Sequence, residues 1–166
     1  MADIANSKLF EQLEGIRNLK DALVVLVKTE WNAGIVDELE RGCKKVFEQF
    51  DIAYRTIVVP GAVEIPFAIQ QCWANNNAPT AFIGLGCVIR GDTPHFDYVC
   101  QSVTTGITQL NLALQVPVIF GVLTVNNMEQ AKERIGGAHG HKGEEAAITA
   151  LKMMVLNNSL KEGSLS

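Results

Sequence analysis

The sequence predicts an α/β fold, a three-layer α/β/α sandwich with a four-stranded, mostly parallel sheet. Two observations lead to this prediction. Four short apolar runs alternate with longer segments in which apolar residues recur at helical spacing. The runs are continuous rather than interleaved with polar residues, which is typical of strands that helices cover on both faces. With 166 residues, of which 48% are hydrophobic and 19% charged, the chain can build one domain with a substantial core.

The first half of the chain supplies two strands and two helices. A continuous, β-branched run over 22–27 predicts the first strand, and apolar residues at helical spacing from Ile35 to Phe50 predict the helix that follows. The second strand, 53–59, stops at a Pro-Gly turn signal. The next helix ends near 75–77, and its apolar positions are Ile65, Ile69, Cys72 and Trp73.

The second half repeats this order and then adds two helices. The third strand spans 81–89 and the fourth 118–123. The long helix between them has apolar positions at Val99, Val103, Ile107, Leu110 and Leu114. Helices are expected over 128–135 and 144–157, with a Gly/His-rich loop between them. Because crossovers between successive strands are right-handed, this order predicts a parallel sheet with helices on both faces.

The domain organisation is simple. Residues 1–19 mix polar and apolar side chains without a clear pattern, and we expect an N-terminal arm there. Residues 20–160 are expected to form a single α/β domain, and residues 161–166 a C-terminal tail.

Composition argues against several classes of function. The net charge is -4, and no Lys/Arg cluster interleaves with aromatic residues, so a nucleic-acid partner is not expected. No apolar run reaches the roughly 18 residues of a membrane-spanning helix, and no secretory signal pattern opens the chain, which predicts a cytoplasmic location and no membrane partner. Walker, GxGxxG and GxSxG motifs are also absent. Reduced thiols are favoured over disulfides or a metal cluster, because no CxxC pair joins the four cysteines Cys43, Cys72, Cys87 and Cys100.

The most informative segment, Gly91 to Asp97, directly follows the third strand. It places the hydroxyl of Thr93, backbone N–H groups and the imidazole of His95 at a strand-to-helix turn, where an anion and a proton transfer can be handled together. In a parallel sheet, ligands bind outside the carboxyl ends of the strands. Thr93 as a helix N-cap and His95 as a surface residue of the first helical turn are the structural alternatives.

Other polar segments fall at the same predicted edge. Trp31 follows the first strand in a polar turn, where it would either stack on a flat heterocycle or cover a core or an interface. Glu64 follows the second strand at a helix start, where a carboxylate also favours the helix dipole without any ligand. Arg134 and Lys142 fit either an anion site or a solvated loop. The nearby histidines lack a third ligand, so no metal is expected.

Four segments together resemble the signature blocks of the 6,7-dimethyl-8-ribityllumazine synthase family. They are Val59-Pro-Gly-Ala-Val-Glu-Ile-Pro66, Gly86-Cys-Val-Ile-Arg-Gly-Asp-Thr-Pro-His-Phe-Asp-Tyr-Val99, Pro117-Val-Ile-Phe-Gly-Val-Leu-Thr124 and Glu129-Gln-Ala-Lys-Glu-Arg134. The likeness runs from about Val24 to Leu156. It implies a flavodoxin-like fold and a transferase of riboflavin biosynthesis without a cofactor. The family condenses 5-amino-6-(D-ribitylamino)uracil with 3,4-dihydroxy-2-butanone 4-phosphate to the lumazine, releasing phosphate and water.

The resemblance also implies a role for each site residue. His95 would transfer protons, and Trp31 would stack on the pyrimidine. Ala62, Val63 and Glu64 would contact the pyrimidine and ribityl chain, and backbone groups would come from Cys87, Val88 and Ile89. The phosphate would lie at Asp92 and Thr93. A neighbouring subunit would supply Phe120, Arg134 and Lys142.

Two positions depart from the family pattern. Asp92 stands where several relatives carry a small neutral residue, and a carboxylate beside a phosphate is repulsive unless it points away. Val63 replaces a position that is often aromatic, which thins the packing over the ribityl chain. Neither departure changes the expected reaction, because proton transfer and binding of the phosphate depend on other residues.

A site shared between subunits implies a homo-oligomer built from pentamers. The short loop over 136–143 and an arm without proline favour an icosahedral shell of sixty chains over a free pentamer or decamer. Riboflavin synthase is a further expected partner. Two alternatives stay open, a flavin-binding or cage-forming protein of flavodoxin-like fold without catalysis, and a different phospho-sugar lyase or transferase.

Overall fold

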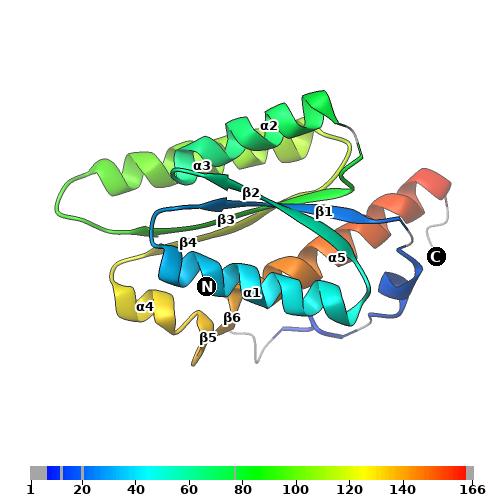
Figure 1. Cartoon of the computed structure of the whole chain (residues 1–166), viewed down its shortest axis with the longest axis horizontal. Helices are drawn as coiled ribbons and strands as arrows, with labels where there is room; N and C mark the ends of the chain where they lie inside the picture. Colours follow the sequence, from blue (N-terminus) through cyan, green and yellow to red (C-terminus); the bar gives the residue numbers. More distant parts are fainter. Residues whose placement is uncertain (1–6, 12, 20, 77, 164–166) are drawn as a thin grey trace.

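The computed structural model describes residues 7–163 apart from 12, 20 and 77. Parts of the predicted N-terminal arm and C-terminal tail, residues 1–6, 12 and 164–166, therefore lie outside the described residues. The described chain forms three layers, with a sheet between two layers of helices (Figure 1).

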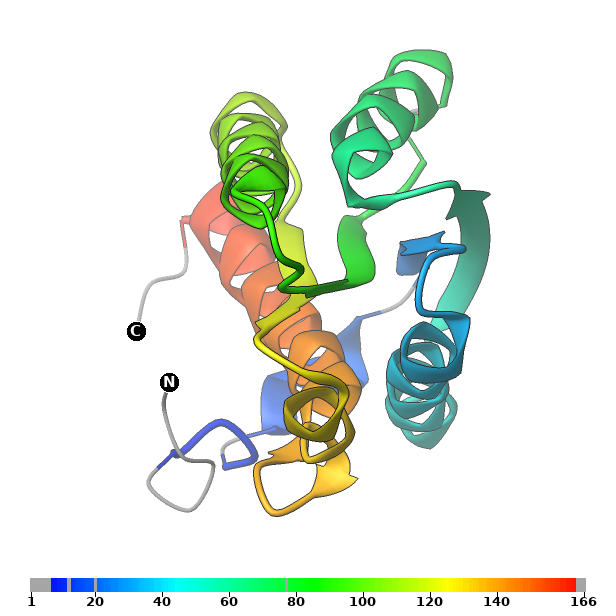
Figure 2. The same ribbon diagram turned by 90° about the vertical axis from the view of Figure 1, so that its left-hand side faces the viewer.

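Four parallel strands build the central sheet. They are β1 (Leu23–Thr29), β2 (Ala53–Val59), β3 (Ala81–Ile89) and β4 (Val118–Val125), in the order β2-β1-β3-β4. Helices α2 (Ile65–Asn75) and α3 (His95–Ala113) cover one face, and α1 (Ala33–Gln49) and α5 (Lys142–Glu162) cover the other (Figures 1 and 2). This arrangement confirms the predicted three-layer fold.

The central strand β1 explains why the sheet is parallel and buried. Val24 and Leu26 point into the core under α1 and α5, whereas Val25 and Val27 point into the core under α2 and α3. All four side chains are at most 2% exposed. An apolar residue is therefore required at each of these four consecutive positions, because successive side chains of a strand face opposite layers.

The segment after β4 differs from the sequence prediction. Helix α4 is short, Met128–Lys132, so a helix reaching Ile135 is wrong. Two short strands follow in place of the expected loop, β5 (Ile135–Gly137) and β6 (Gly140–His141), which pair antiparallel. Gly136 and Gly140 have φ of 112° and 75°, values that glycine adopts without strain. Such short strands leave no periodic pattern in the sequence.

Both ends of the chain contribute to the folded body. Residues Glu14–Asn18 form a 3₁₀ helix, η2, whose Ile16 is 2% exposed and packs in the core under α1 and α5. At the other end, α5 continues to Glu162 and stops at Gly163, whose φ is 69°. Parts of the predicted arm and tail thus pack as regular structure.

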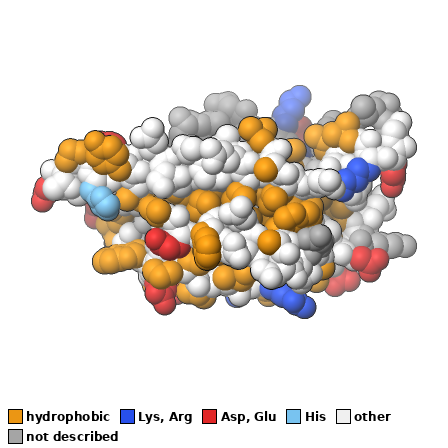
Figure 3. Space-filling model, turned by 90° about the horizontal axis from the view of Figure 1, so that it is seen from above, with side chains coloured by type: hydrophobic (Ala, Val, Ile, Leu, Met, Phe, Trp, Pro, Cys, Tyr) orange, Lys and Arg blue, Asp and Glu red, His pale blue; other side chains and the backbone are white. Residues whose placement is uncertain are grey.

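The outer layer of α2 and α3 carries several exposed large hydrophobic side chains. Seen from this side, hydrophobic side chains are spread over the surface (Figure 3). Phe67 on α2 is 67% exposed, and Tyr98 and Leu112 on α3 are 69% and 84% exposed. These side chains are available for contact with another molecule.

A buried carboxylate, Glu40 of α1, links three elements. It accepts hydrogen bonds from Lys28 of β1 at 2.7 Å, from Thr56 of β2 at 2.7 Å and from Lys44 of α1 at 2.8 Å. Burial raises the pKa of this carboxyl group, but the hydrogen bonds from Lys28, Lys44 and Thr56 outweigh burial and lower the pKa to about 2.

We therefore expect Glu40 to stabilise the fold in a pH-dependent way. Its folded pKa lies below the ordinary value of 4.5, so its contribution is complete above that pH and is lost as the pH falls towards about 2. The substitution Glu40→Gln should lower the free energy of unfolding by about 1–3 kcal/mol at neutral pH. Urea unfolding between neutral and acid pH should show this difference shrinking. Glu38→Gln, at a more exposed ion pair with Arg41, is the control and should change little. A constant difference at all pH values would contradict the assignment.

Candidate active site

The carboxyl ends of all four strands lie at one edge of the sheet, on the left in Figure 1 and towards the viewer in Figure 2. Hydrogen bonds fix the loop after β1 to both neighbouring strand ends. The N–H of Trp31 donates to the carbonyl of Pro60 at 3.3 Å, and the amide of Asn32 donates to the carbonyl of Cys87 at 2.8 Å. Asn32 itself has a φ of 56°. The loop is anchored, while the indole of Trp31 is 73% exposed.

Trp31 and Glu64 meet at the turn that follows β2. Residues Ala62–Glu64 form a 3₁₀ helix, η3, that leads into α2. A Cβ atom on Gly61 would lie 3.0 Å from Glu64 Oε2 and 3.5 Å from Trp31 Cδ1, so glycine leaves room for both groups. The Glu64 side chain makes no capping hydrogen bond. A carboxylate and an exposed aromatic ring therefore share one corner of the rim, beside the exposed Val63 and the buried Ala62.

The end of β3 offers backbone rather than side-chain chemistry. Cys87 is buried, and Val88 and Ile89 are half-buried. Burial raises the pKa of the Cys87 thiol to about 11, which keeps it protonated near neutral pH and makes it a poor nucleophile. Its carbonyl already accepts the hydrogen bond from Asn32.

The turn after β3 carries the predicted anion and proton-transfer groups. Residues 90–95 are all exposed, and α3 begins at His95. The N-cap position is Pro94, so Thr93 lies one residue earlier than an N-cap would, and its hydroxyl accepts from the His95 N–H at 3.4 Å. Asp92, Thr93 and His95 are thus presented together at a helix N-terminus, where backbone N–H groups favour an anion.

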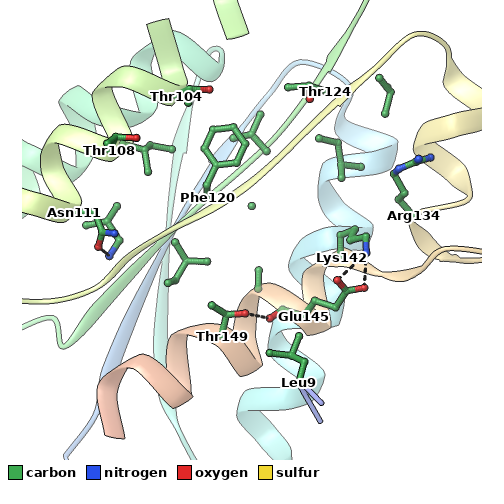
Figure 4. Close-up of a pocket in the computed structure, with 18 of the residues that line it drawn as sticks. Leu9, Thr104, Thr108, Asn111, Phe120, Thr124, Arg134, Lys142, Glu145 and Thr149 are labelled. Atoms are coloured by element: carbon green, nitrogen blue, oxygen red, sulfur yellow. Dashed lines mark hydrogen bonds and ion pairs between the residues drawn. The ribbon is translucent and has the colours of Figure 1, made fainter. Parts of the chain in front are cut away.

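A second set of predicted residues lies in a groove of about 750 Å³ along β4. The groove runs between α3 and α5, with Thr104, Thr108 and Asn111 on one side and Glu145 and Thr149 on the other (Figure 4). Phe120 projects from β4, and Arg134 and Lys142 line one end. Because β4 is an edge strand, the groove lies over the open edge of the sheet.

Two cations are held in this groove. Lys142 Nζ lies 2.8 Å from both carboxylate oxygens of Glu145, and the two side chains are 15% and 17% exposed. Arg134 donates to the carbonyl of Gln130 at 2.6 Å, and its guanidinium lies 4.0 Å from Glu133. The sequence analysis missed Glu145, although its spacing of three residues from Lys142 on a helix was a usable signal.

The structure therefore divides the predicted site residues into two groups. The rim group comes from the ends of β1, β2 and β3 and consists of Trp31, Ala62, Val63, Glu64, Cys87, Val88, Ile89, Asp92, Thr93 and His95. The groove group consists of Phe120, Arg134 and Lys142. Within the described part of the chain, no residue of the rim group lines the groove.

The histidines and cysteines near these two groups contact other parts of the protein or are buried in it. His141 caps α5 by accepting from the Glu144 N–H at 3.4 Å, and His139 lies 3.7 Å from Glu133. All four cysteines are free; Cys43 is buried like Cys87, while Cys72 and Cys100 are half-buried. Among the described residues, no three His, Cys, Asp or Glu side chains gather as a metal site would require.

None of the described helices has the length and apolar character needed to cross a membrane.

Comparison with known proteins agrees with the resemblance found in the sequence. The family model described as 6,7-dimethyl-8-ribityllumazine synthase matches residues 21–158. A protein of that name from Porphyromonas gingivalis is 49% identical over 137 residues, which cover 81% of this chain and 84% of the relative. One from Parabacteroides distasonis is 47% identical over 132 residues, covering 78% and 82%.

The chain belongs to the 6,7-dimethyl-8-ribityllumazine synthase family. As a member of this family it is a transferase of riboflavin biosynthesis. Among solved structures, a GDP-L-fucose synthetase from Naegleria fowleri bound to NADP aligns with 88% of this chain and 48% of its own. That alignment has 14% identity and a TM-score of 0.36, which is too weak to inform fold or function.

Close packing between α1 and α5 sets the position of Lys142. A Cβ atom on Gly143 would overlap the Leu39 carbonyl oxygen, so the first turn of α5 can touch α1 only because this residue is glycine. We expect Gly143→Ala to push the helices apart and lower the free energy of unfolding by about 1–3 kcal/mol. Denaturant unfolding measures this. Gly34→Ala is the matched control, because no atom lies within 4 Å of its added Cβ. Equal stability of the two variants would contradict the packing argument.

Proposed function

We propose that this chain condenses 5-amino-6-(D-ribitylamino)uracil with 3,4-dihydroxy-2-butanone 4-phosphate. The product is 6,7-dimethyl-8-ribityllumazine, with release of phosphate and water, at the penultimate step of riboflavin biosynthesis. Family membership supports this activity. The main observation in its support is that the predicted site residues fall into two separate groups, the rim and the groove. In a site shared between two chains, one chain would contribute its rim and its neighbour would contribute its groove.

The rim corner of Trp31 and Glu64 suits the pyrimidine. An indole that is 73% exposed on an anchored loop offers a flat face for stacking against a heterocycle. Glu64 can accept hydrogen bonds from the ribityl hydroxyls, since its carboxylate is not used as a helix cap. Backbone groups of Cys87, Val88 and Ile89 continue this surface towards the turn after β3.

The turn after β3 suits the phosphate and the proton transfers. Backbone N–H groups at the start of α3 and the Thr93 hydroxyl bind the phosphate, and Arg134 of a neighbouring chain pairs with it. The Asp92 carboxylate would repel the phosphate, so only its backbone N–H takes part. His95 moves protons between the reacting groups, because an imidazole exchanges protons near neutral pH.

The reaction needs proximity and proton transfer. The primary amine attacks the ketone and forms an imine with loss of one water. Elimination of phosphate leaves an enol that tautomerises to a carbonyl, and the second amine attacks this carbonyl and closes the ring with loss of a second water. Holding both substrates between the two aromatic side chains, Trp31 and Phe120, replaces a bimolecular encounter by a step within one complex. Arg134 and Lys142 favour departure of the phosphate by offsetting its charge.

Formation of the product tests this function directly. Pure protein is incubated with both substrates, and the fluorescent lumazine is followed over time. We expect product only when both substrates are present. Flavin binding without product would favour the non-catalytic flavodoxin-like alternative, and phosphate release without lumazine would favour another phospho-sugar lyase or transferase.

A mixed-subunit experiment tests whether the site is shared. His95→Asn removes the proton-transfer group of the rim, and Arg134→Ala removes a cation of the groove, so each homo-oligomer should lose most of its activity. Unfolding the two variants together at equal amounts and refolding them should restore about a quarter of the sites, because a random ring pairs an intact rim with an intact groove at that frequency. Activity is measured before and after mixing, with each variant refolded alone as the control. No recovery in well-assembled mixtures would place both residues in one chain's site.

A closed ring of five chains, assembled further into a shell of sixty, is the proposed assembly. The exposed hydrophobic surface on α2 and α3 and the open edge of β4 support association of copies. The segment 136–143 is short: most of it forms the β5-β6 ribbon, and its last two residues begin α5. Riboflavin synthase as a partner and a cytoplasmic location stay predictions from the sequence.

Sedimentation velocity measures the assembly. We expect one large species of sixty chains at neutral pH in several buffers, with pentamers as the product of partial dissociation. A single pentamer-sized species in every buffer would contradict the shell. An active monomer would contradict the shared site as well.

A further inference from the structure

The turn between β3 and α3 is spanned by one long side chain, that of Arg90. The backbone of Arg90 is anchored, because its N–H donates to the Val125 carbonyl of β4 at 2.9 Å. From this fixed point the side chain reaches across the turn to the first residues of α3. The residues that it bypasses include Asp92, Thr93 and His95.

Two interactions fix the far end of Arg90. Its guanidinium lies 2.8 Å and 3.4 Å from the two carboxylate oxygens of Asp97, a two-point contact that sets orientation as well as distance. Its central carbon also lies 4.2 Å from the centre of the Phe96 ring, where the cation faces the aromatic π-system. One side chain thus joins the end of a strand to the first turn of a helix.

Because this turn is exposed to solvent, its conformation depends on the contacts that Arg90 makes with Phe96 and Asp97. Residues 90–95 are all exposed, so core packing does not determine their conformation. The Thr93 hydroxyl holds the His95 N–H at 3.4 Å, a long hydrogen bond. Gly91 has open space around its Cα, with no atom within 4 Å of an added Cβ. The contacts of Arg90 with Phe96 and Asp97 therefore restrain the turn more strongly than the hydrogen bond between Thr93 and His95 does.

We propose that Arg90 is a positioning residue: it clamps Asp97 and Phe96 and so orders the turn that presents Thr93 and His95 to the phosphorylated substrate. The inference rests on the proposed function. It assigns Arg90 no contact with substrate, because its guanidinium is engaged by Asp97 and Phe96. Exposed ion pairs contribute little to global stability, so the effect of the clamp should be local.

The test compares Arg90→Gln with Arg41→Gln in the full-length protein. Arg41 is also an exposed arginine paired to a carboxylate at 2.8 Å, but it lies on α1 away from this turn. We expect Arg90→Gln to speed amide hydrogen exchange in the peptide 90–97 and to lower kcat/KM for the phosphorylated ketone about tenfold. Binding of a pyrimidine analogue should stay within about twofold, because Trp31 stacks on a separately anchored loop. That binding is followed by Trp31 fluorescence in a Trp73→Phe background.

Variants of the partners separate positioning from general damage. Asp97→Asn should reproduce the exchange and kinetic effects, and the double variant should be no worse than either single one, since both remove the same clamp. Arg90→Lys keeps the charge but not the two-point contact, so its activity should be intermediate. The melting temperature should match that of Arg41→Gln.

Each outcome decides the proposal. Unchanged exchange and unchanged kinetics in Arg90→Gln would overturn it, and so would equal losses for both substrates or a lowered melting temperature, which would indicate a structural role. Additive effects of Arg90→Gln and Asp97→Asn would show that the two residues act separately and would also overturn it. If the wild-type protein forms no lumazine, the proposed function fails and the kinetic role of Arg90 fails with it. The exchange data would then still decide whether Arg90 orders the turn.

Discussion

Burial of the two inner strands on both faces is the constraint on which the rest of this structure depends. β1 and β3 each send alternate side chains into two different cores, so helices must cover both sides of the sheet. Helical crossovers then make every strand run in the same direction. As a result, every strand ends at one edge, and loops distant in the sequence, around Trp31, Glu64 and His95, all lie along that edge. The chemistry of the site follows from this topology.

The sheet order has a second consequence, because it leaves β4 at an edge. A groove along that edge, between α3 and α5, contains Phe120, Arg134 and Lys142. The rim, by contrast, is built at the ends of the other three strands. One chain thus displays two surfaces of different character, an aromatic and acidic rim with a helix N-terminus and a groove that contains Arg134, Lys142 and Glu145. Such a division is understandable if the copies of this chain complete one another.

The charged side chains of Glu40 and Lys142, both largely removed from solvent, are each paired with groups of opposite charge or with hydrogen-bonding groups. Glu40 is surrounded by two lysines and a hydroxyl, and Lys142 is held by both oxygens of Glu145. Both arrangements offset the cost of removing a charge from water. They differ in surroundings, since Glu40 ties α1 to the sheet, whereas Lys142 and Glu145 line an open groove. The first arrangement is a structural link, and the second leaves the cation beside space that a ligand can enter.

The sequence alone determined the fold class, because periodicity and β-branched runs are local signals. The strand over 81–89 and the helix start near His95 follow directly from them. Four segments also resembled the signature blocks of the family, and this resemblance made Trp31, Glu64, His95 and Arg134 candidate site residues. Tertiary structure decided what no local pattern encodes. It joined Asn32 to Cys87 and Arg90 to Asp97 and Phe96, paired Lys142 with Glu145, and folded residues 135–141 into a ribbon. It also separated the rim from the groove. These features depend on which side chains meet in space, and that is fixed only when the sheet order and the helix packing are known.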